Sequence, residues 1–279
     1  MGESENLDFC VAWEYNQFDK LEFDSLTQSY KGGSLAMKKS ITVKFLHILS
    51  LIAFVFMYQE YTSEISWKVA SLFDYFRVDN DGTFMMVSVH HIIMALITLG
   101  ILYILHRWKN IDFKITFKVD ACGIKYTLIY CAACLVYFIF WYVIFGFMLD
   151  SVAEYDYELS TINVLGTLGF QLFLSGTEEL MFRALPIGCL KAVWGKNSKF
   201  ADLVILLLTS LLFTVAHIHF GKPLLSQWYG LILVFIHGLM YGIAYLKTKS
   251  IVYPMVMHGV SNFISVGGCY MYMMLSCII

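Results

Sequence analysis

The amino-acid sequence predicts an all-α fold, a polytopic bundle of about seven transmembrane helices. Of the 279 residues, 59% are hydrophobic and only 14% are charged, whereas a water-soluble domain usually carries about a quarter charged residues. The apolar runs are continuous and roughly as long as a helix that crosses a bilayer. They do not show the alternation of membrane β-strands. We therefore expect the lipid bilayer to be the solvent for most of this chain.

The apolar runs predict seven spans. In chain order they are Ile41–Tyr58, Phe84–Leu105, Tyr126–Leu149, Thr161–Cys189, Ala201–Phe220, Trp228–Leu246 and Ile251–Leu275. The third run contains no charged residue at all. The fourth is the longest, and it carries Glu178, Glu179 and Arg183. That fourth run therefore differs from an ordinary span.

The distribution of positive charge predicts the orientation of the chain. Sixteen of the 19 Lys and Arg residues precede or begin the first span or lie toward alternate loops after it. Short loops that are rich in Lys and Arg stay on the cytoplasmic side. We expect the amino terminus inside and the carboxyl terminus outside, in a membrane that we take to be that of a bacterial cell.

The chain divides into three predicted parts. Residues 1–39 are an acidic N-terminal extension, and Met37-Lys38-Lys39 resembles the start of a bacterial membrane protein, so residues 1–36 are either an upstream extension or an artificial addition. Residues 40–160 hold three spans without an assigned role, and residues 161–279 hold the polar motifs. The net charge of −2, without a basic arm, gives no support for a nucleic-acid partner.

The first polar motif lies in the fourth run. Ionisable side chains within spans are costly and usually face a partner or a polar cavity. Glu179 and Arg183 are four residues apart, so on a helix they lie on one face and can pair. Glu178 points about 100° away around the helix, which leaves its carboxylate to face something else and suits a general base. A buried structural ion pair is the plain alternative.

Two further motifs follow in later runs. Phe213 precedes His217 by four residues, and His258 precedes Asn262 by four residues, which places the last two on one helix face. Taken singly, such residues are usually hydrogen-bonded contacts between packed membrane helices. We interpret His90, His91 and His237 as structural contacts of this kind. Gly238 and Gly242 are also interpreted as structural, because small residues four apart let helices pack closely.

The three motifs can meet at one depth in the bilayer. With a rise of about 1.5 Å per residue, Glu178, His217, His258 and Asn262 lie roughly 14–24 Å from the cytoplasmic ends of their spans. This agreement requires the fourth helix to be long or bent. Gly176 is a weak point at which it could bend.

The order Glu-Glu-x-x-x-Arg, Phe-x-x-x-His and His-x-x-x-Asn resembles the CPBP family, the CAAX proteases and bacteriocin-processing enzymes that are also called Abi proteins. These intramembrane proteases are related to the type II CAAX prenyl endopeptidase. The resemblance covers roughly residues 160–275, with Ala184 in place of a frequent Gly. It implies a helix bundle around a conical cavity in the last four spans, so that residues 161–279 form a catalytic core.

The resemblance also implies roles for the motif residues. Glu178 and His217 would activate water, while His258 and Asn262 would stabilise the oxyanion. Glu179, Arg183 and Phe213 would support the motifs. Peptide hydrolysis needs a base for the water and donors for the developing oxyanion, which agrees with this set of residue types. The expected partners are a peptide or membrane-protein substrate and the bilayer.

Several alternatives stay open on the sequence. Glu178, His217 and His258 could hold zinc, because a catalytic zinc site usually has three protein ligands, but we favour chemistry without an obligatory metal. A non-catalytic immunity or scaffold protein is the main alternative function. A proton-coupled carrier is the weaker one, since carriers commonly show two related halves and these motifs all lie in the last four spans.

Overall fold

The structure is a computed structural model. It describes residues 34–75, 78–79, 82, 84–149, 159–194, 198–219 and 221–276, with side chains from residue 45 on. The predicted extension at residues 1–39 therefore lies almost wholly outside the described residues. The chain forms two compact units, Met1–Ser50 and Leu51–Ile279. All packing described below belongs to the second unit.

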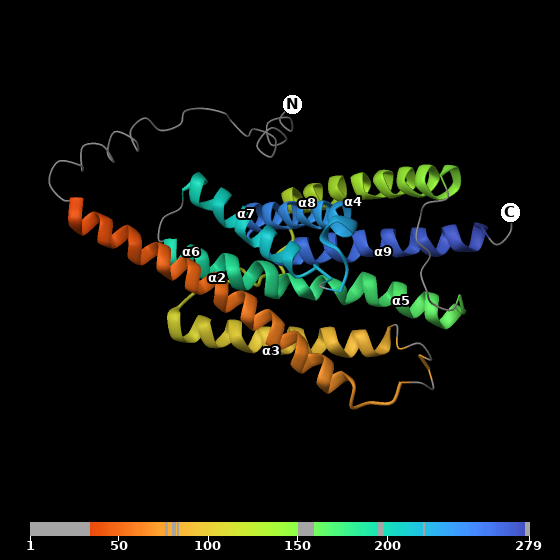
Figure 1. Cartoon of the computed structure of the whole chain (residues 1–279), viewed down its shortest axis with the longest axis horizontal. Helices are drawn as coiled ribbons and strands as arrows, with labels where there is room; N and C mark the ends of the chain where they lie inside the picture. Colours follow the sequence, from red (N-terminus) through yellow and green to blue (C-terminus); the bar gives the residue numbers. More distant parts are fainter. Residues whose placement is uncertain are drawn as a thin grey trace, which may run out of the picture. The chain divides into compact units, whose positions relative to one another are not determined.

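Every regular element in the described residues is helical, which confirms the predicted all-α class. The α-helices are α2 (Ser34–Ala70), α3 (Met85–Lys109), α4 (Ala121–Trp141), α5 (Thr161–Phe173), α6 (Leu185–Trp194), α7 (Lys199–Val215), α8 (Leu224–Thr248) and α9 (Val252–Ser276) (Figure 1). Three short helical segments join them, η3 (Tyr142–Met148), η4 (Ser175–Thr177) and η5 (Leu180–Ala184).

Four helical segments of the described chain are long and apolar enough to cross a membrane. They are Phe45–Ala70, Met85–Lys109, Ala121–Met148 and Leu224–Thr248. They correspond to the predicted first, second, third and sixth spans, and they identify an integral membrane protein. The count of seven spans stays a prediction. Helix α2 runs on past the predicted end at Tyr58, supported near its end by an ion pair of 2.6 Å between Lys68 and Glu64, one helical turn apart.

The predicted fourth span, which the depth argument requires to be long or bent, is interrupted near Gly176 and is not one continuous helix. Helix α5 ends at Phe173, and a 3₁₀ turn (η4) and a π-helical turn (η5) precede α6. Pro186 explains part of the break, because it has no backbone N–H to give to the carbonyl of Phe182. That carbonyl instead accepts a hydrogen bond of 3.2 Å from Nη1 of Arg183. π-Helical turns of this kind occur frequently at functional sites.

Two glycines let the broken helix approach α9 closely. A Cβ atom on Gly176 would lie 2.2 Å from the carbonyl oxygen of Met255, and one on Gly259 would lie 2.3 Å from that of Leu172. Both obstacles are backbone atoms, which cannot rotate away. The two glycines therefore fix how near the segment after α5 lies to α9.

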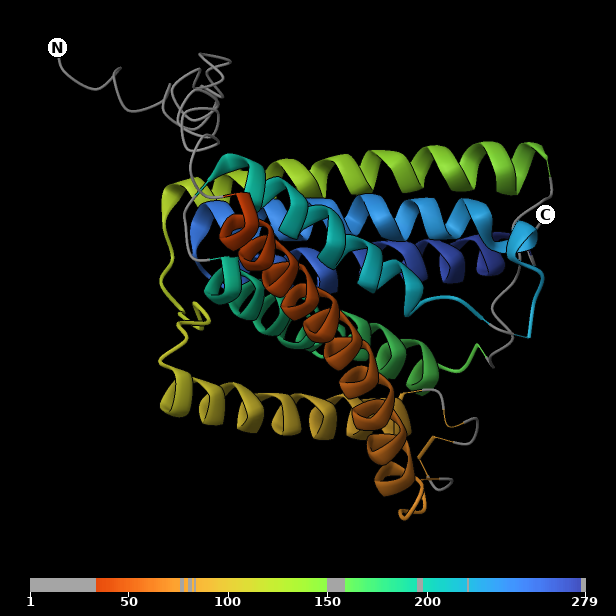
Figure 2. The same ribbon diagram turned by 60° about the vertical axis from the view of Figure 1, so that its left-hand side comes forward.

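Helix α9 is the centre of the second unit. It packs against α4, α5, α8 and the η4 turn, and α4, α8 and α9 run side by side in Figure 2. The buried core between these helices includes Phe182, Phe213, Tyr241 and Met257. Because α9 touches so many partners, side chains on its inner face can meet residues from several distant parts of the sequence.

Candidate active site

The four residues with predicted catalytic roles line one cavity of about 400 Å³. Glu178, His217, His258 and Asn262 all contribute to its wall. The remaining lining residues are Phe138, Gln171, Phe213, Gly230, Leu233, Val234, His237, Tyr241, Ser261, Ser265 and Val266. Phe138 belongs to α4, so the wall is not built from the last four predicted spans alone. The conical shape stays a prediction.

Glu179 joins two of the motifs. Its Oε2 atom lies 3.3 Å from Nε of Arg183, and both side chains are fully buried. Its Oε1 atom accepts a hydrogen bond of 2.9 Å from Nδ1 of His258. The Nε and Oε2 atoms are close but not aligned as a hydrogen bond, so charge attraction holds this contact. Glu179 thus connects Arg183 of the first motif with His258 of the third motif.

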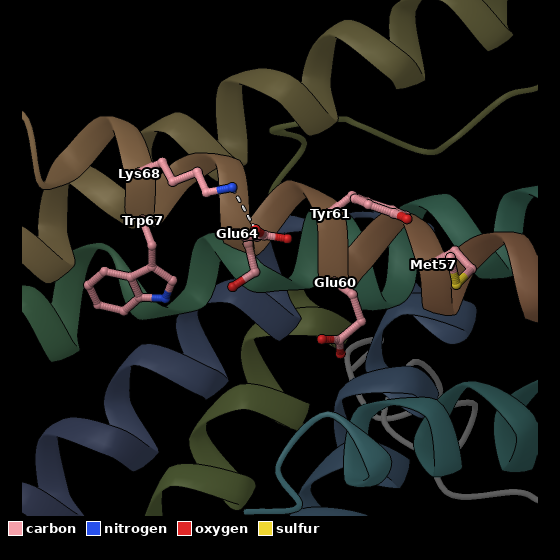
Figure 3. Close-up of a pocket in the computed structure, with 7 residues that line it drawn as sticks. Met57, Glu60, Tyr61, Glu64, Trp67 and Lys68 are labelled. Carbon is pink, nitrogen blue, oxygen red and sulfur yellow. Dashed lines mark hydrogen bonds and ion pairs between the residues drawn. The ribbon is translucent and has the colours of Figure 1, made fainter. Parts of the chain in front are cut away.

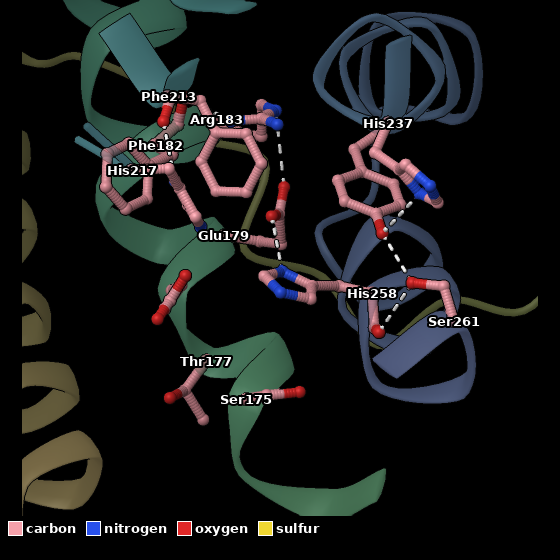
Figure 4. A network of polar contacts seen from close by, with 12 residues as sticks. Ser175, Thr177, Glu179, Phe182, Arg183, Phe213, His217, His237, His258 and Ser261 are labelled. Atoms are coloured by element: carbon pink, nitrogen blue, oxygen red, sulfur yellow. Dashed lines mark hydrogen bonds and ion pairs between the residues drawn. The ribbon is translucent and has the colours of Figure 1, made fainter. Parts of the chain in front are cut away.

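Arg183 is enclosed by aromatic rings. Its guanidinium carbon lies 4.6 Å from the ring centre of Phe213 and 5.7 Å from that of Tyr241. Such cation–π contacts stabilise a cation that has lost its water. Together with the carboxylate of Glu179 they compensate a charge that would otherwise be costly to bury. The network is drawn in Figure 4, where Arg183, Glu179 and His258 follow one another.

Glu178 has a partner that sequence reasoning missed. Its Oε1 atom lies 3.0 Å from Nε2 of His91, which belongs to α3. The interpretation of His91 as a purely structural residue at the start of the second span does not include this contact. The available signal was the pair of adjacent histidines within an apolar span, since ionisable residues there often mark a functional region.

His217 lies just beyond the C-terminal end of α7 rather than within a span. Its N–H donates to the carbonyl of Thr214 at 3.0 Å, and its Nδ1 atom lies 2.8 Å from the carbonyl oxygen of Phe213. A carbonyl only accepts, so Nδ1 carries the proton. In the neutral ring Nε2 then has a lone pair. The described residues contain no hydrogen bond between His217 and Glu178, although both line the cavity.

The third motif lies on α9. The His258 ring stacks on Tyr241, with ring centres 5.2 Å apart and planes 13° apart. The hydroxyl groups of Tyr241 and Ser261 are 2.7 Å apart, and the Ser261 hydroxyl donates to the carbonyl of His258 at 2.9 Å. Asn262 is half-buried, and its amide makes no hydrogen bond to a described residue. That amide can therefore bind a molecule in the cavity.

His237 belongs to a second polar group at the same cavity. Its Nδ1 atom contacts the hydroxyl of Tyr130, which also donates to the hydroxyl of Tyr241 at 3.0 Å. Tyr130 comes from α4 and Tyr241 from α8. This group supports the interpretation of His237 as a contact between packed helices, and it also adds polar atoms to the cavity wall.

The donor set does not form a three-ligand metal site. Among the described residues no group of three or more His, Cys, Asp and Glu side chains is arranged to hold a metal ion. Nδ1 of His217 and Nδ1 of His258 are already hydrogen-bonded, so Nε2 is the one nitrogen of each ring that could bind a metal. No step below depends on zinc, and a chelator added to the reaction tests metal dependence directly.

The fold and the cavity define an integral membrane protein with a buried polar centre, and the comparisons with known proteins agree with this class. Residues 159–264 match the family model described as type II CAAX prenyl endopeptidase Rce1-like. The match includes all seven motif residues, confirms the predicted CPBP/CAAX resemblance over this segment and implies a CAAX-type protease. Neither the curated proteins nor the solved structures contain a match.

Proposed function

We propose that the protein is an intramembrane endopeptidase that hydrolyses a peptide bond inside the 400 Å³ cavity. One observation carries the proposal. A carboxylate, two histidines and an amide from three separate parts of the sequence line the same cavity. Hydrolysis needs this combination of proton acceptors and hydrogen-bond donors.

Glu178 and His217 are the groups that activate water in this proposal. Water attacks the carbonyl carbon, and its proton passes to the Glu178 carboxylate or to the Nε2 lone pair of His217. The C–N bond of the resulting tetrahedral intermediate then breaks, and the same proton passes to the departing nitrogen. The products are a carboxylic acid and an amine, so one water is consumed for each bond cleaved.

His258 and Asn262 are the groups that stabilise the oxyanion. The Asn262 amide can donate directly. Nδ1 of His258 already donates to Glu179, so Nε2 can donate to an oxyanion only when the ring carries a second proton. By accepting from Nδ1, the buried carboxylate of Glu179 fixes the orientation of the His258 ring, which is its role in the proposed site.

The wall of the cavity supports a proposal for the substrate class. Phe138, Leu233, Val234 and Val266 supply apolar surface beside the polar groups. A peptide with a lipidated, CAAX-like end or an apolar bacteriocin-type segment matches such a wall, whereas a strongly charged peptide would lose its hydration there.

The first experiment measures proteolysis by the detergent-purified protein on fluorogenic peptides, with and without a lipid group. Glu178→Ala is expected to reduce cleavage by at least about 100-fold, because it removes a proton acceptor from the transition state. His217→Ala is also expected to reduce cleavage, because His217 is the second group proposed to activate water. His219→Ala is the matched control, since His219 is exposed two residues further on, and it is expected to cleave like the wild type.

Two results would overturn the proposal. One is full activity in Glu178→Ala. The other is a wild-type protein that cleaves none of the lipidated or unmodified peptides and whose cellular phenotype survives alanine at His217 and His258. The second result would favour the immunity or scaffold function. A chelator added to the wild-type reaction tests metal dependence separately.

A further inference from the structure

The proposed base is held by a helix outside the region that matches the family. Nε2 of His91 lies 3.0 Å from Oε1 of Glu178, and the two side chains are 9% and 20% exposed. The family match begins at residue 159, so α3 contributes a contact that the motifs do not contain. The predicted unassigned spans at residues 40–160 thereby acquire a connection to the site.

The orientation of the His91 ring is fixed by two neighbours. Its Nδ1 atom lies 2.9 Å from the carbonyl oxygen of Val87, one turn earlier on α3. Its ring meets the ring of Phe170 on α5 edge-on, with centres 4.8 Å apart. Rotating the ring would break the contact with Val87 and displace Phe170. His91 is therefore preorganised toward Glu178.

His90 supports His91 from the other side. Nδ1 of His90 lies 3.3 Å from Nδ1 of His91, and Nε2 of His90 lies 3.3 Å from the hydroxyl of Ser63. Trp67 stacks on the His90 ring at 4.1 Å. Ser63 and Trp67 belong to α2 and line a groove along it, where Figure 3 shows Trp67 near Lys68 and Glu64. A polar chain thus runs from Glu178 to α2.

One arrangement of protons satisfies every contact in this chain. Nδ1–H of His91 donates to Val87 and is shared with Nδ1 of His90, and Nε2–H of His90 donates to Ser63. Since Nδ1 of His91 is a donor here, the contact between Nε2 and the Glu178 carboxylate requires a second proton between those two atoms. His91 therefore binds Oε1 of Glu178 as a hydrogen-bond donor when Glu178 is ionised.

The contact makes the two carboxylate oxygens of Glu178 unequal. Oε1 of Glu178 is occupied by His91, and Oε2 accepts no hydrogen bond from a described residue. We propose that His91 is a positioning residue that fixes Glu178 so that Oε2 faces the attacking water, with His90 and Trp67 holding His91 in place. The catalytic consequence rests on the proposed protease function, whereas the contact itself does not.

The kinetic experiment compares His91→Phe with His91→Gln in the full-length protein. Phe keeps the ring but loses both nitrogens, and kcat is expected to fall about 10- to 100-fold because small misplacements of reacting groups have effects of that size. KM is expected to stay unchanged. Gln can donate to Oε1 and is expected to recover most of the lost kcat. His106→Phe is the matched control, since His106 is an exposed histidine on the same helix.

Three kinetic results would contradict the proposal. Wild-type kcat in His91→Phe would show that Glu178 needs no such partner. An equal loss in His91→Phe and His91→Gln, at unchanged melting temperature, would show that the donor is not what matters. A change in KM alone would assign His91 to substrate binding instead.

A second readout does not depend on protease activity. Nitrogen-15 NMR of histidine-labelled protein, with His91 assigned from the signals missing in His91→Gln, reports which ring nitrogens carry protons. Replacing Glu178 by Gln puts an amide donor opposite Nε2, so that nitrogen is expected to change from a donor to an acceptor. An unchanged His91 signal in Glu178→Gln would overturn the contact. A changed signal in a protein without protease activity would retain the contact and reject the proposed function.

Discussion

At the scale of single residues, Phe213 shows how an apolar side chain connects the three sequence motifs. Its ring meets His217 at 4.6 Å and His258 at 5.8 Å, both edge-on, and carries the Arg183 guanidinium at 4.6 Å. One ring thus touches a residue of each of the other two motif groups. It sets their mutual positions without taking part in proton transfer.

The buried pair of Glu179 and Arg183 gives a stability prediction. Arg183→Met is expected to lower the free energy of unfolding by about 3–5 kcal/mol, because it leaves a buried carboxylate without its counter-charge. The double variant with Glu179→Gln is expected to be more stable than Arg183→Met alone. Thermal unfolding in detergent measures both. A double variant less stable than either single one would show that the pair is not coupled in this way.

At the scale of elements, the break between α5 and α6 builds the site. Two adjacent glutamates in it point to different partners, Glu178 to His91 on α3 and Glu179 to His258 on α9. A regular helix would also separate the two side chains, but the close approach to α9 depends on Gly176 and Gly259. Packing of backbone against backbone is thus a condition for the chemistry.

Substitution of these glycines tests that condition. Gly176→Ala is expected to lower stability by about 1–3 kcal/mol, the usual cost of overpacking, and to reduce cleavage because it displaces the glutamates from α9. Gly169→Ala is the control on the adjoining helix α5, where a Cβ meets nothing within 4 Å. It is expected to be neutral or to gain up to about 1 kcal/mol, as alanine favours a helix. Equal melting temperatures for the two variants would contradict this reasoning.

At the scale of the whole molecule, the segment that matches the family does not form the candidate site alone. The family match begins at residue 159, yet α4 supplies Phe138 to the cavity wall and α3 supplies His91 to Glu178. Tyr130, also on α4, contacts Tyr241 behind His258. The earlier spans thus have a structural role in the site, and removing them is expected to open the cavity.

The orientation of the whole chain in the membrane is a separate prediction. The loop between α3 and α4 contains Lys114 and Lys118 and is expected to face the cytoplasm, whereas the loop with Lys222 between α7 and α8 is expected to face the opposite side. Single cysteines at Lys118 and Lys222, in a background without the native cysteines, are labelled with an impermeant thiol reagent on intact cells. We expect labelling of Lys222→Cys and not of Lys118→Cys. Labelling of Lys118→Cys alone would show that the orientation is the reverse of the predicted one.

The sequence by itself determined the all-α class of the protein and the family that its later segment resembles. Hydrophobicity and run length are local properties, so they predict membrane helices directly, and four spans were found where expected. The ordered motifs predicted the family resemblance over roughly residues 160–275, and the family model matches residues 159–264. Residue spacing along the chain needs no knowledge of the fold.

Only the tertiary structure decided which groups meet. His91 is separated from Glu178 by 87 positions, and no spacing rule connects residues on different helices. The path of the chain after α5 also depends on the close approach of Gly176 to the backbone of Met255. These two residues are far apart in the sequence. Local sequence patterns specify where each helix forms and how apolar it is. Packing between helices specifies which residue Glu178 contacts.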